Sequence, residues 1–186
     1  KRKSNNFFKS IINTNKYPLT YIENLKACEL TKILENSYRA TNIALIDEWS
    51  KYAEYQGIDL YEVINAISVR PTHSNIMKPG FGVGGYCLTK DPLFAKVSQN
   101  IFSNKSKVSF PFSELAIKVN RRMPENTFEA LNSVVKNLRN KKVCILGLTY
   151  KSDVEDMRDS PSLEIIPSLV KSNCKLRVFD PEGMME

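Results

Sequence analysis

The longest helical pattern in the chain runs from Leu25 to about Gln56, and it limits what this sequence can fold into. Apolar or small residues recur in it with a period near 3.6, and neither Pro nor Gly interrupts it before Gly57, a natural helix end. A helix of about 30 residues is ~45 Å long, which exceeds the width of a small domain. We therefore expect it to run through a core or through a subunit interface.

A polar stripe interrupts the apolar band of this helix. Lys32, Asn36 and Arg39 follow one another at a spacing that places them on one helix face. A solvent-facing surface is the simplest interpretation of such a stripe, and a polar site is the other.

Three shorter helices are expected at about 59–67, 91–100 and 111–138, the first two opened by an aspartate suited to a helix start. Pro124 should kink the third helix or divide it in two, because proline donates no backbone hydrogen bond. Residues 19–22, upstream of the long helix, could form a short strand.

From residue 141 the pattern changes to strand, helix and strand. Lys142–Gly147 is a β-branched and apolar run that ends in Gly, as buried parallel strands do, and Lys175–Asp180 is a second strand. Between them, Ser160 and Pro161 have the residue types of an N-cap and a first helical position. The fold class is therefore mixed α and α/β, with an all-helical central domain followed by the beginning of an α/β domain.

The composition argues against several functions. No apolar run approaches the roughly 18 residues that a membrane span needs, so we expect no membrane partner. The net charge of +7 comes from scattered Lys and Arg, so we expect no nucleic-acid partner either. The four cysteines form no CxxC pair and His73 is the only histidine, so no metal site is expected. Cys28 and Cys144 are interpreted as buried thiols of a reducing, cytoplasmic protein.

The stretch from Pro79 to Pro92 holds four of the seven glycines, and it also contains Cys87, Lys90 and Asp91. Glycines this dense allow backbone conformations closed to other residues and let a backbone lie directly against a ligand. A cysteine at the end of such a loop can meet a reactive atom of that ligand. The simpler interpretation is a flexible turn with an ordinary cysteine, since a lone glycine-rich loop is a weak signal.

Three motifs together resemble the UDP-glucose/GDP-mannose dehydrogenase family. Ala27–Asn36 resembles the start of that family's central helix, and Phe81–Pro92 resembles its nucleophile loop. Gly147–Lys151, followed by Asp156–Ser162, resembles the opening of its C-terminal nucleotide-sugar domain. The motifs occur in the family's order, and the resemblance extends from about residue 19 to the end. It implies that the α/β part is Rossmann-like.

The resemblance implies an NAD-dependent oxidation of the C6 alcohol of a UDP-sugar to a carboxylate, with two NAD per turnover. Cys87 would attack the intermediate aldehyde as a thiolate, and the thiohemiacetal would become a thioester that water hydrolyses. Lys32 and Asn36 would stabilise negative charge on the C6 oxygen. Asp91 would orient water or Lys32, or assist proton transfer.

The same resemblance implies the binding residues. The substrate would contact Lys32, Asn36, Arg70, Lys78, Phe81, Gly82, Gly84, Tyr150 and Lys151. The NAD would contact Cys87, Lys90 and Arg158. Whether Arg70 or His73 takes the position that reaches a neighbouring subunit's site stays open. Pro79-Gly80 and Met123–Glu125 resemble family members that oxidise UDP-N-acetylhexosamines more than those that oxidise UDP-glucose.

No GxGxxG fingerprint follows a strand, and the first residue is not Met, so we expect a fragment. Residues 1–24 would be the tail of a missing N-terminal NAD-binding domain, 25–138 a helical dimerisation domain with the nucleophile loop, and 139–186 part of the nucleotide-sugar domain. We expect a homodimer through the long helix and no turnover by the truncated chain. The alternatives are a dimerisation module without activity, a nucleic-acid binder, and another dehydrogenase with a helical second domain.

Overall fold

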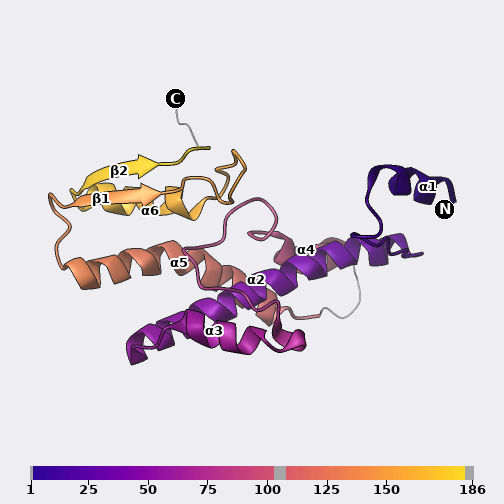
Figure 1. Cartoon of the computed structure of the whole chain (residues 1–186), viewed down its shortest axis with the longest axis horizontal. Helices are drawn as coiled ribbons and strands as arrows, with labels where there is room; N and C mark the ends of the chain where they lie inside the picture. Colours follow the sequence, from indigo (N-terminus) through magenta and orange to yellow (C-terminus); the bar gives the residue numbers. More distant parts are fainter. Residues whose placement is uncertain (1, 103–107, 183–186) are drawn as a thin grey trace. The chain divides into compact units, whose positions relative to one another are not determined.

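The computed structural model describes residues 2–102 and 108–182. The chain forms two compact units, Lys1–Lys32 and Ile33–Glu186. The first unit contains α1 (Arg2–Ile11) and the beginning of α2 (Leu25–Gln56) (Figure 1). The side-chain oxygen of Asn24 caps α2, because it accepts from the backbone N–H of Lys26 at 2.9 Å.

The strand expected at residues 19–22 is wrong, since these residues take no regular secondary structure. A strand needs a neighbour to take up its backbone hydrogen bonds, and the described residues of this unit include no other strand.

The bounds predicted for α2 are confirmed, and Gly57 follows its end with φ +69°. The buried positions of α2 are mostly small or polar: Asn36, Ala40, Ala44, Ile46, Asp47 and Ala53. By contrast, the large side chains of Leu45 and Trp49 are 50% and 52% exposed. Small residues let other elements approach the helix closely, while much of the apolar band stays uncovered in the single chain.

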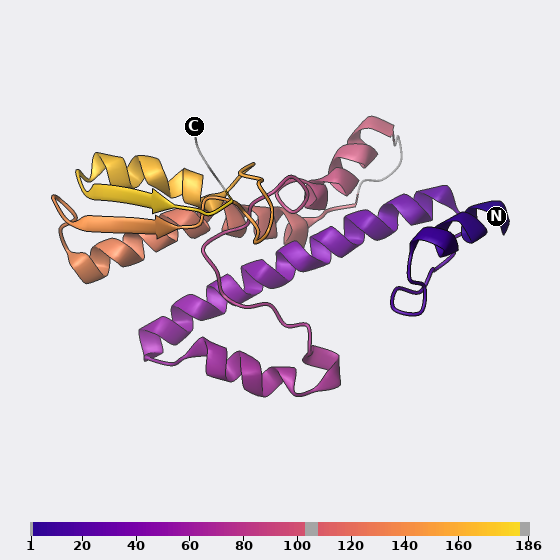
Figure 2. The same cartoon turned by 45° about the horizontal axis from the view of Figure 1, so that its top comes forward.

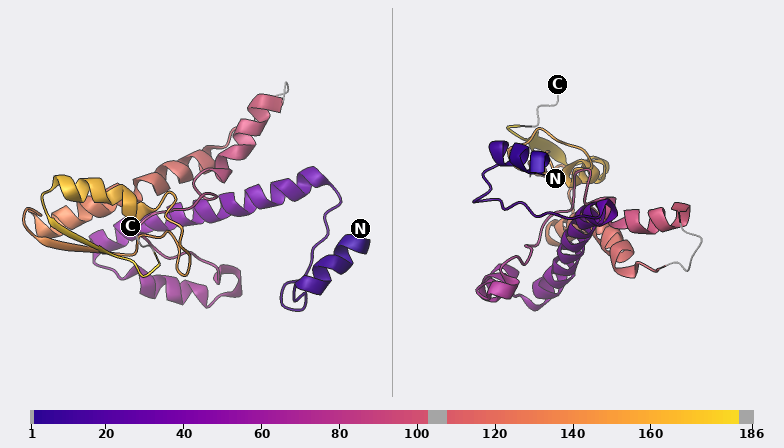
Figure 3. Two further views of the ribbon diagram at one scale, coloured as in Figure 1. Left: turned by 90° about the horizontal axis from the view of Figure 1, so that it is seen from above. Right: turned by 90° about the vertical axis from the view of Figure 1, so that its right-hand side faces the viewer.

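Helix α3 (Leu60–Ser68) turns back alongside the carboxyl-terminal part of α2 (Figures 2 and 3). Its predicted N-cap is confirmed, because Asp59 Oδ1 accepts from the backbone N–H of Tyr61 at 2.8 Å. Two short 3₁₀ helices follow, η1 (Pro71–His73) and η2 (Asp91–Leu93), and then α4 (Phe94–Phe102). The helix predicted from Asp91 thus begins with a separate 3₁₀ turn.

Helix α5 (Pro111–Val135) runs through Pro124 without a break, so the expected division into two helices is wrong. Proline removes one helix hydrogen bond, but tertiary contacts hold the helix on the amino-terminal side of it. Asn120 Nδ2 donates to the backbone oxygen of Ala40 on α2 at 3.0 Å, and Pro124 itself is buried. The helix ends at Val135 rather than at about residue 138.

Strands β1 (Lys142–Leu146) and β2 (Lys175–Phe179) form a parallel pair joined through α6 (Pro161–Lys171), as predicted. Ile145 pairs with Val178 in the register of the sheet. Helices α5 and α6 pack together against the strands (Figure 1). The buried core consists of Leu138, Ile145, Ile165 and Leu169. A helix-rich chain with a small parallel sheet confirms the mixed fold class.

Two further expectations need correction. Cys28 and Cys144 are exposed rather than buried. On β1, the side chain of Cys144 alternates with those of Val143 and Ile145, which pack into the core, so it projects to the opposite face of the strand. Ser160 holds the predicted N-cap position with extended backbone, but its Oγ caps nothing among the described residues.

No helix within residues 2–102 or 108–182 has both the length and the apolar character required to cross a membrane.

Leu169→Ala should lower the free energy of unfolding by about 2–5 kcal/mol, because Leu169 is only 1% exposed and its loss leaves a cavity in the core. Urea unfolding followed by circular dichroism measures the change. Val170→Ala, on the exposed side of the same helix, should change it by about 0.5 kcal/mol or less. Equal effects of the two substitutions would contradict this assignment of the core.

Candidate active site

The glycine-rich loop ends in a tight turn that carries Cys87. The backbone oxygen of Cys87 accepts from the N–H groups of Asp91 at 2.9 Å and Lys90 at 3.2 Å. Thr89 Oγ1 donates to the backbone oxygen of Gly85 at 2.9 Å and holds the turn from the other side. The residue Cys87 is exposed at the surface of the chain.

The structure brings Asn36 of α2 to this turn. Asn36 is 2% exposed, and its Nδ2 donates to Asp91 Oδ2 at 2.7 Å. A buried amide that bonds to a carboxylate fixes both side chains, since breaking the pair would leave a polar group unsatisfied. Lys32 precedes Asn36 on α2 by one helical turn but belongs to the first unit, so its approach to Cys87 stays a prediction.

Three glycines of the loop lie against the chain's own α/β part. A Cβ on Gly84 would come within 2.5 Å of Tyr150 Cβ, and one on Gly85 within 2.6 Å of Tyr150 Cε2. A Cβ on Gly82 would come within 2.7 Å of Pro161. Real Cβ atoms do not approach other atoms this closely. These positions therefore require glycine for packing within the chain, whether or not a ligand also contacts the loop.

A backbone hydrogen bond also joins the glycine-rich loop to the α/β part, because the N–H of Gly85 donates to the backbone oxygen of Arg158 at 2.9 Å.

Two cations lie over the ring of Tyr86, the residue before Cys87. Lys90 Nζ is 3.5 Å from the ring centroid, and Arg158 Cζ is 5.1 Å from it. The electron-rich face of an aromatic ring attracts such cations, and this ring belongs to the residue that precedes Cys87 in the sequence.

Arg158 is held in place by Asp156. Its Nε donates to Asp156 Oδ1 at 2.9 Å and its Nη2 donates to Asp156 Oδ2 at 2.6 Å. These side-chain hydrogen bonds, together with one from the backbone N–H of Arg158, lower the pKa of Asp156 to about 2. The same side-chain hydrogen bonds and the negative charge of Asp156 raise the pKa of Arg158. Because two nitrogens of the guanidinium are bonded to the two carboxylate oxygens, the orientation of the guanidinium plane is fixed.

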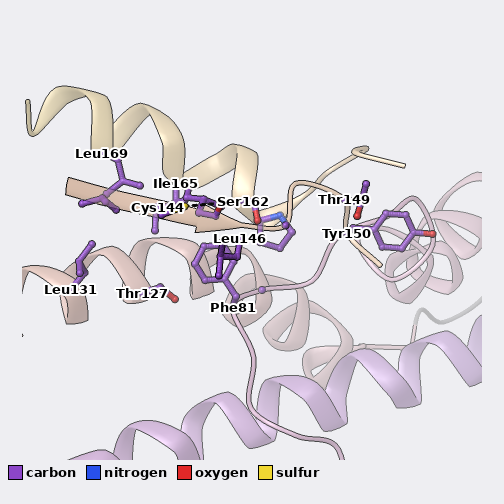
Figure 4. A pocket seen from close by; sticks show the side chains of 15 residues that line it. Phe81, Thr127, Leu131, Cys144, Leu146, Thr149, Tyr150, Ser162, Ile165 and Leu169 are labelled. Carbon is purple, nitrogen blue, oxygen red and sulfur yellow. Dashed lines mark hydrogen bonds between the residues drawn. The ribbon is translucent and has the colours of Figure 1, made fainter. Parts of the chain in front are cut away.

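A cavity of about 580 Å³ lies between α5 and the β1–α6 layer (Figure 4). Apolar side chains such as Leu131, Ile165 and Leu169 line it, and Cys87 does not. Tyr150 lies at one end with its hydroxyl directed away from the other labelled side chains (Figure 4). The lining suits apolar packing better than it suits a phosphate-bearing ligand.

A smaller cavity, of about 360 Å³, lies beside the Cys87 turn. Tyr86, Lys90, Arg121 and Glu164 are among its lining residues. Burial raises the pKa of Glu164, and the negative charge of Asp159 adds to this while Arg121 opposes it.

The remaining sequence-predicted residues divide into exposed and packed ones. Arg70, His73, Lys78 and Lys151 are exposed. His73 Nδ1 lies 2.8 Å from Thr72 Oγ1. Phe81, by contrast, packs against the buried core.

Sequence reasoning missed the two carboxylates that order this region, Asp156 and Asp180. Asp180 Oδ2 accepts from the backbone N–H groups of Leu148 and Thr149, in the loop after β1. The position of Asp180 at the carboxyl end of β2 was a usable signal, because the ends of neighbouring parallel strands meet at one edge of a sheet. Asp156 gave no comparable signal, since its partner is only two residues away on an irregular loop.

Comparison with known proteins agrees with this architecture. Residues 26–122 match the central domain of the UDP-glucose/GDP-mannose dehydrogenase family, and residues 144–186 match its UDP-binding domain. The chain belongs to the UDP-glucose/GDP-mannose dehydrogenase family.

Individual relatives are similar over most of this chain. The UDP-N-acetyl-D-mannosamine dehydrogenase of Methanocaldococcus jannaschii is 36% identical over 160 residues, which cover 86% of this chain and 35% of that protein. The UDP-glucose 6-dehydrogenase of Rickettsia prowazekii is 32% identical over 165 residues, which cover 88% and 37%. The chain spans little more than a third of the length of the curated relatives it matches.

A solved structure has a similar fold. The UDP-D-ManNAc dehydrogenase of Pyrococcus horikoshii superposes with a TM-score of 0.76 at 30% identity, covering 98% of this chain and 42% of that one.

Gly85→Ala should lower the free energy of unfolding by about 1–3 kcal/mol, because Gly85 has φ +79° and the new Cβ would collide with the ring of Tyr150. Thermal unfolding measures the loss. Gly80→Ala is the matched control, since nothing lies within 4 Å of its Cβ position. A Gly85→Ala protein as stable as the Gly80→Ala protein would show that Tyr150 does not lie on this loop.

The carboxyl group of Asp156 should titrate at about pH 2 in the folded chain. Because this pKa is lowered from its unfolded value of about 3.9, the pair with Arg158 is complete above that value and is lost as the pH falls through 2. Carbon-13 NMR of the carboxyl measures the midpoint, which should rise in Arg158→Met. Lys151→Met removes an equal charge from the same loop and should leave the midpoint in place; an upward shift in both would indicate a general charge effect.

Proposed function

We propose that this chain forms the central and UDP-binding parts of an NAD-dependent UDP-sugar 6-dehydrogenase, with Cys87 as the nucleophile. The observation that carries the proposal is the hydrogen bond between Asn36 and Asp91, which gathers the long helix and the glycine-rich loop behind an exposed cysteine. The family match supports the reaction class, and the matches at residues 26–122 and 144–186 support a central domain followed by a UDP-binding domain. The proposed bounds of these two domains are 25–138 and 139–186, and residues 1–24 would be the tail of a preceding NAD-binding domain.

The chain's own residues would do the following work. The Cys87 thiolate adds to the C6 aldehyde carbon and holds that carbon as a thiohemiacetal and then as a thioester, until water hydrolyses the thioester. Asn36 donates a hydrogen bond to the C6 oxygen as negative charge develops there, and Lys32 supplies a positive charge. Asp91, already bonded to Asn36, orients that amide and the attacking water.

NAD would supply the oxidising power of both oxidation steps. Lys90 and Arg158 fit the edge of an anionic cofactor, since both cations lie over Tyr86 next to Cys87. The β1–α6–β2 unit does not fit the main dinucleotide cradle. Its first loop carries Gly147 without a second glycine, and the acid at the end of β2, Asp180, is bonded to the backbone of that loop. The cofactor would therefore be held chiefly outside this chain.

A UDP-N-acetylhexosamine is the proposed substrate, with UDP-glucose as the alternative. The name of the M. jannaschii relative supports the first and the name of the R. prowazekii relative supports the second. Tyr150 and Lys151 would contact the nucleotide sugar. The exposed side chains of Lys78 and Arg70 would contact its anionic groups. Either Arg70 or His73 would reach this site from a neighbouring subunit. Phe81, Gly82 and Gly84 would contribute through the loop backbone.

The uncovered apolar face of α2 supports a homodimer. Leu34, Leu45 and Trp49 are all at least 50% exposed, and a two-fold mate of the same helix would bury them. The same observation favours the alternative function, a dimerisation module without activity.

A chimera tests the enzyme proposal. This chain replaces the matching 160 residues of the M. jannaschii relative, and NADH formation is measured with UDP-N-acetylmannosamine and UDP-glucose. We expect NADH formation with the first, and Cys87→Ser should abolish carboxylate formation because no thioester can form.

Cys144→Ser is the matched control, since Cys144 is also exposed but lies on β1, and it should keep full activity. Undiminished activity in Cys87→Ser would overturn the nucleophile assignment. A folded chimera that dimerises but oxidises neither sugar would support the dimerisation module instead.

A further inference from the structure

Asp180 is placed directly after β2, and the loop after β1 is bonded to its side chain. Its Oδ2 accepts from the backbone N–H of Leu148, from that of Thr149 at 2.8 Å and from Thr149 Oγ1 at 3.2 Å. Its Oδ1 accepts from the backbone N–H of Glu182 at 2.8 Å. A carboxylate that accepts hydrogen bonds from several N–H groups holds those groups strongly, because hydrogen bonds to an ionised acceptor are about twice as strong as those between neutral groups.

This use differs from the usual one for an acid at this position. In dinucleotide-binding βαβ units, the acidic residue after the second strand binds the hydroxyls of a ribose. Here both carboxylate oxygens are bonded to the chain's own backbone. The acid therefore orders the loop that follows β1.

The ordered loop leads directly to the contact with the glycine-rich loop. Tyr150 follows Thr149, and its N–H donates to the backbone oxygen of Asp156 at 3.0 Å. Its ring covers Gly85, and its Cβ fills the space that a side chain on Gly84 would need. Both glycines lie in the loop that ends in the Cys87 turn. A continuous series of contacts thus joins the end of β2 to the candidate nucleophile.

We propose that Asp180 is a positioning residue for the candidate active site. By holding the backbone of Leu148 and Thr149, it places Tyr150 against the glycine-rich loop and so determines where Cys87 lies relative to the substrate-binding residues Tyr150 and Lys151. This inference rests on the proposed function for its catalytic meaning. The mechanical coupling it describes belongs to the chain by itself.

Hydrogen–deuterium exchange of the 186-residue chain tests the coupling. Asp180→Asn keeps the size of the side chain but leaves one acceptor oxygen and no charge. The amides of Leu148 and Thr149 should then exchange about tenfold faster, the scale of one lost charge-assisted hydrogen bond. The amide of Gly85 should also exchange faster, although it lies on a different loop and bonds to Arg158. The β1 amides should keep their protection.

Three further variants separate positioning from a general loss of structure. Thr149→Val removes one hydrogen bond at constant shape and should speed exchange at Gly85 to a smaller degree than Asp180→Asn. Thr149→Ser keeps the hydroxyl and should leave the exchange rate at Gly85 unchanged. Glu182→Gln removes an equal charge from a neighbouring exposed residue and should change nothing.

Faster exchange at Leu148 and Thr149 with an unchanged rate at Gly85 would overturn the coupling. Loss of β1 protection in both Asp180→Asn and Thr149→Val would also overturn it, because the role of Asp180 would then be to stabilise the fold rather than to position the loop. A chimera without dehydrogenase activity bears on the proposed function and leaves these exchange rates untouched.

Discussion

The contact that the rest of the site depends on is steric: Tyr150 and Pro161 lie where the glycine-rich loop has no side chains. A Cβ at Gly82, Gly84 or Gly85 would come within 2.7 Å of one of them. The absence of three methyl groups thus lets a loop of the helical part lie flat on the α/β part. Once it does, the N–H of Gly85 bonds to the α/β part as well.

The consequence is a candidate site assembled from segments far apart in the sequence. The loop carries Cys87 and Asp91, α2 brings Asn36 to Asp91, and the α/β part brings Arg158 to the ring of Tyr86. The buried amide of Asn36 is paired with the carboxylate of Asp91, because an unpaired amide is costly where water is excluded. The residues of this site come from both the central and the UDP-binding domains that the family models match.

Local sequence signals predicted the elements well where one strong pattern acted alone. The uninterrupted pattern of α2 gave the correct bounds, and Asp59 caps α3 as expected. The same reasoning failed where tertiary contacts decide. It gave a division of the helix at Pro124 as one of two outcomes, but α5 continues through this buried proline. It also expected a strand at 19–22, where the described residues of the unit include no other strand to pair with it.

The sequence by itself determined the order of the elements, the mixed fold class and the candidate nucleophile loop, since periodicity, capping residues and a dense run of glycines act over short distances. Only the tertiary structure decided that Asn36 meets Asp91, that Tyr150 accounts for Gly84 and Gly85, and that Asp180 holds the loop before Tyr150. Such pairings join residues tens of positions apart. They depend on how helices and strands pack, which no local pattern encodes.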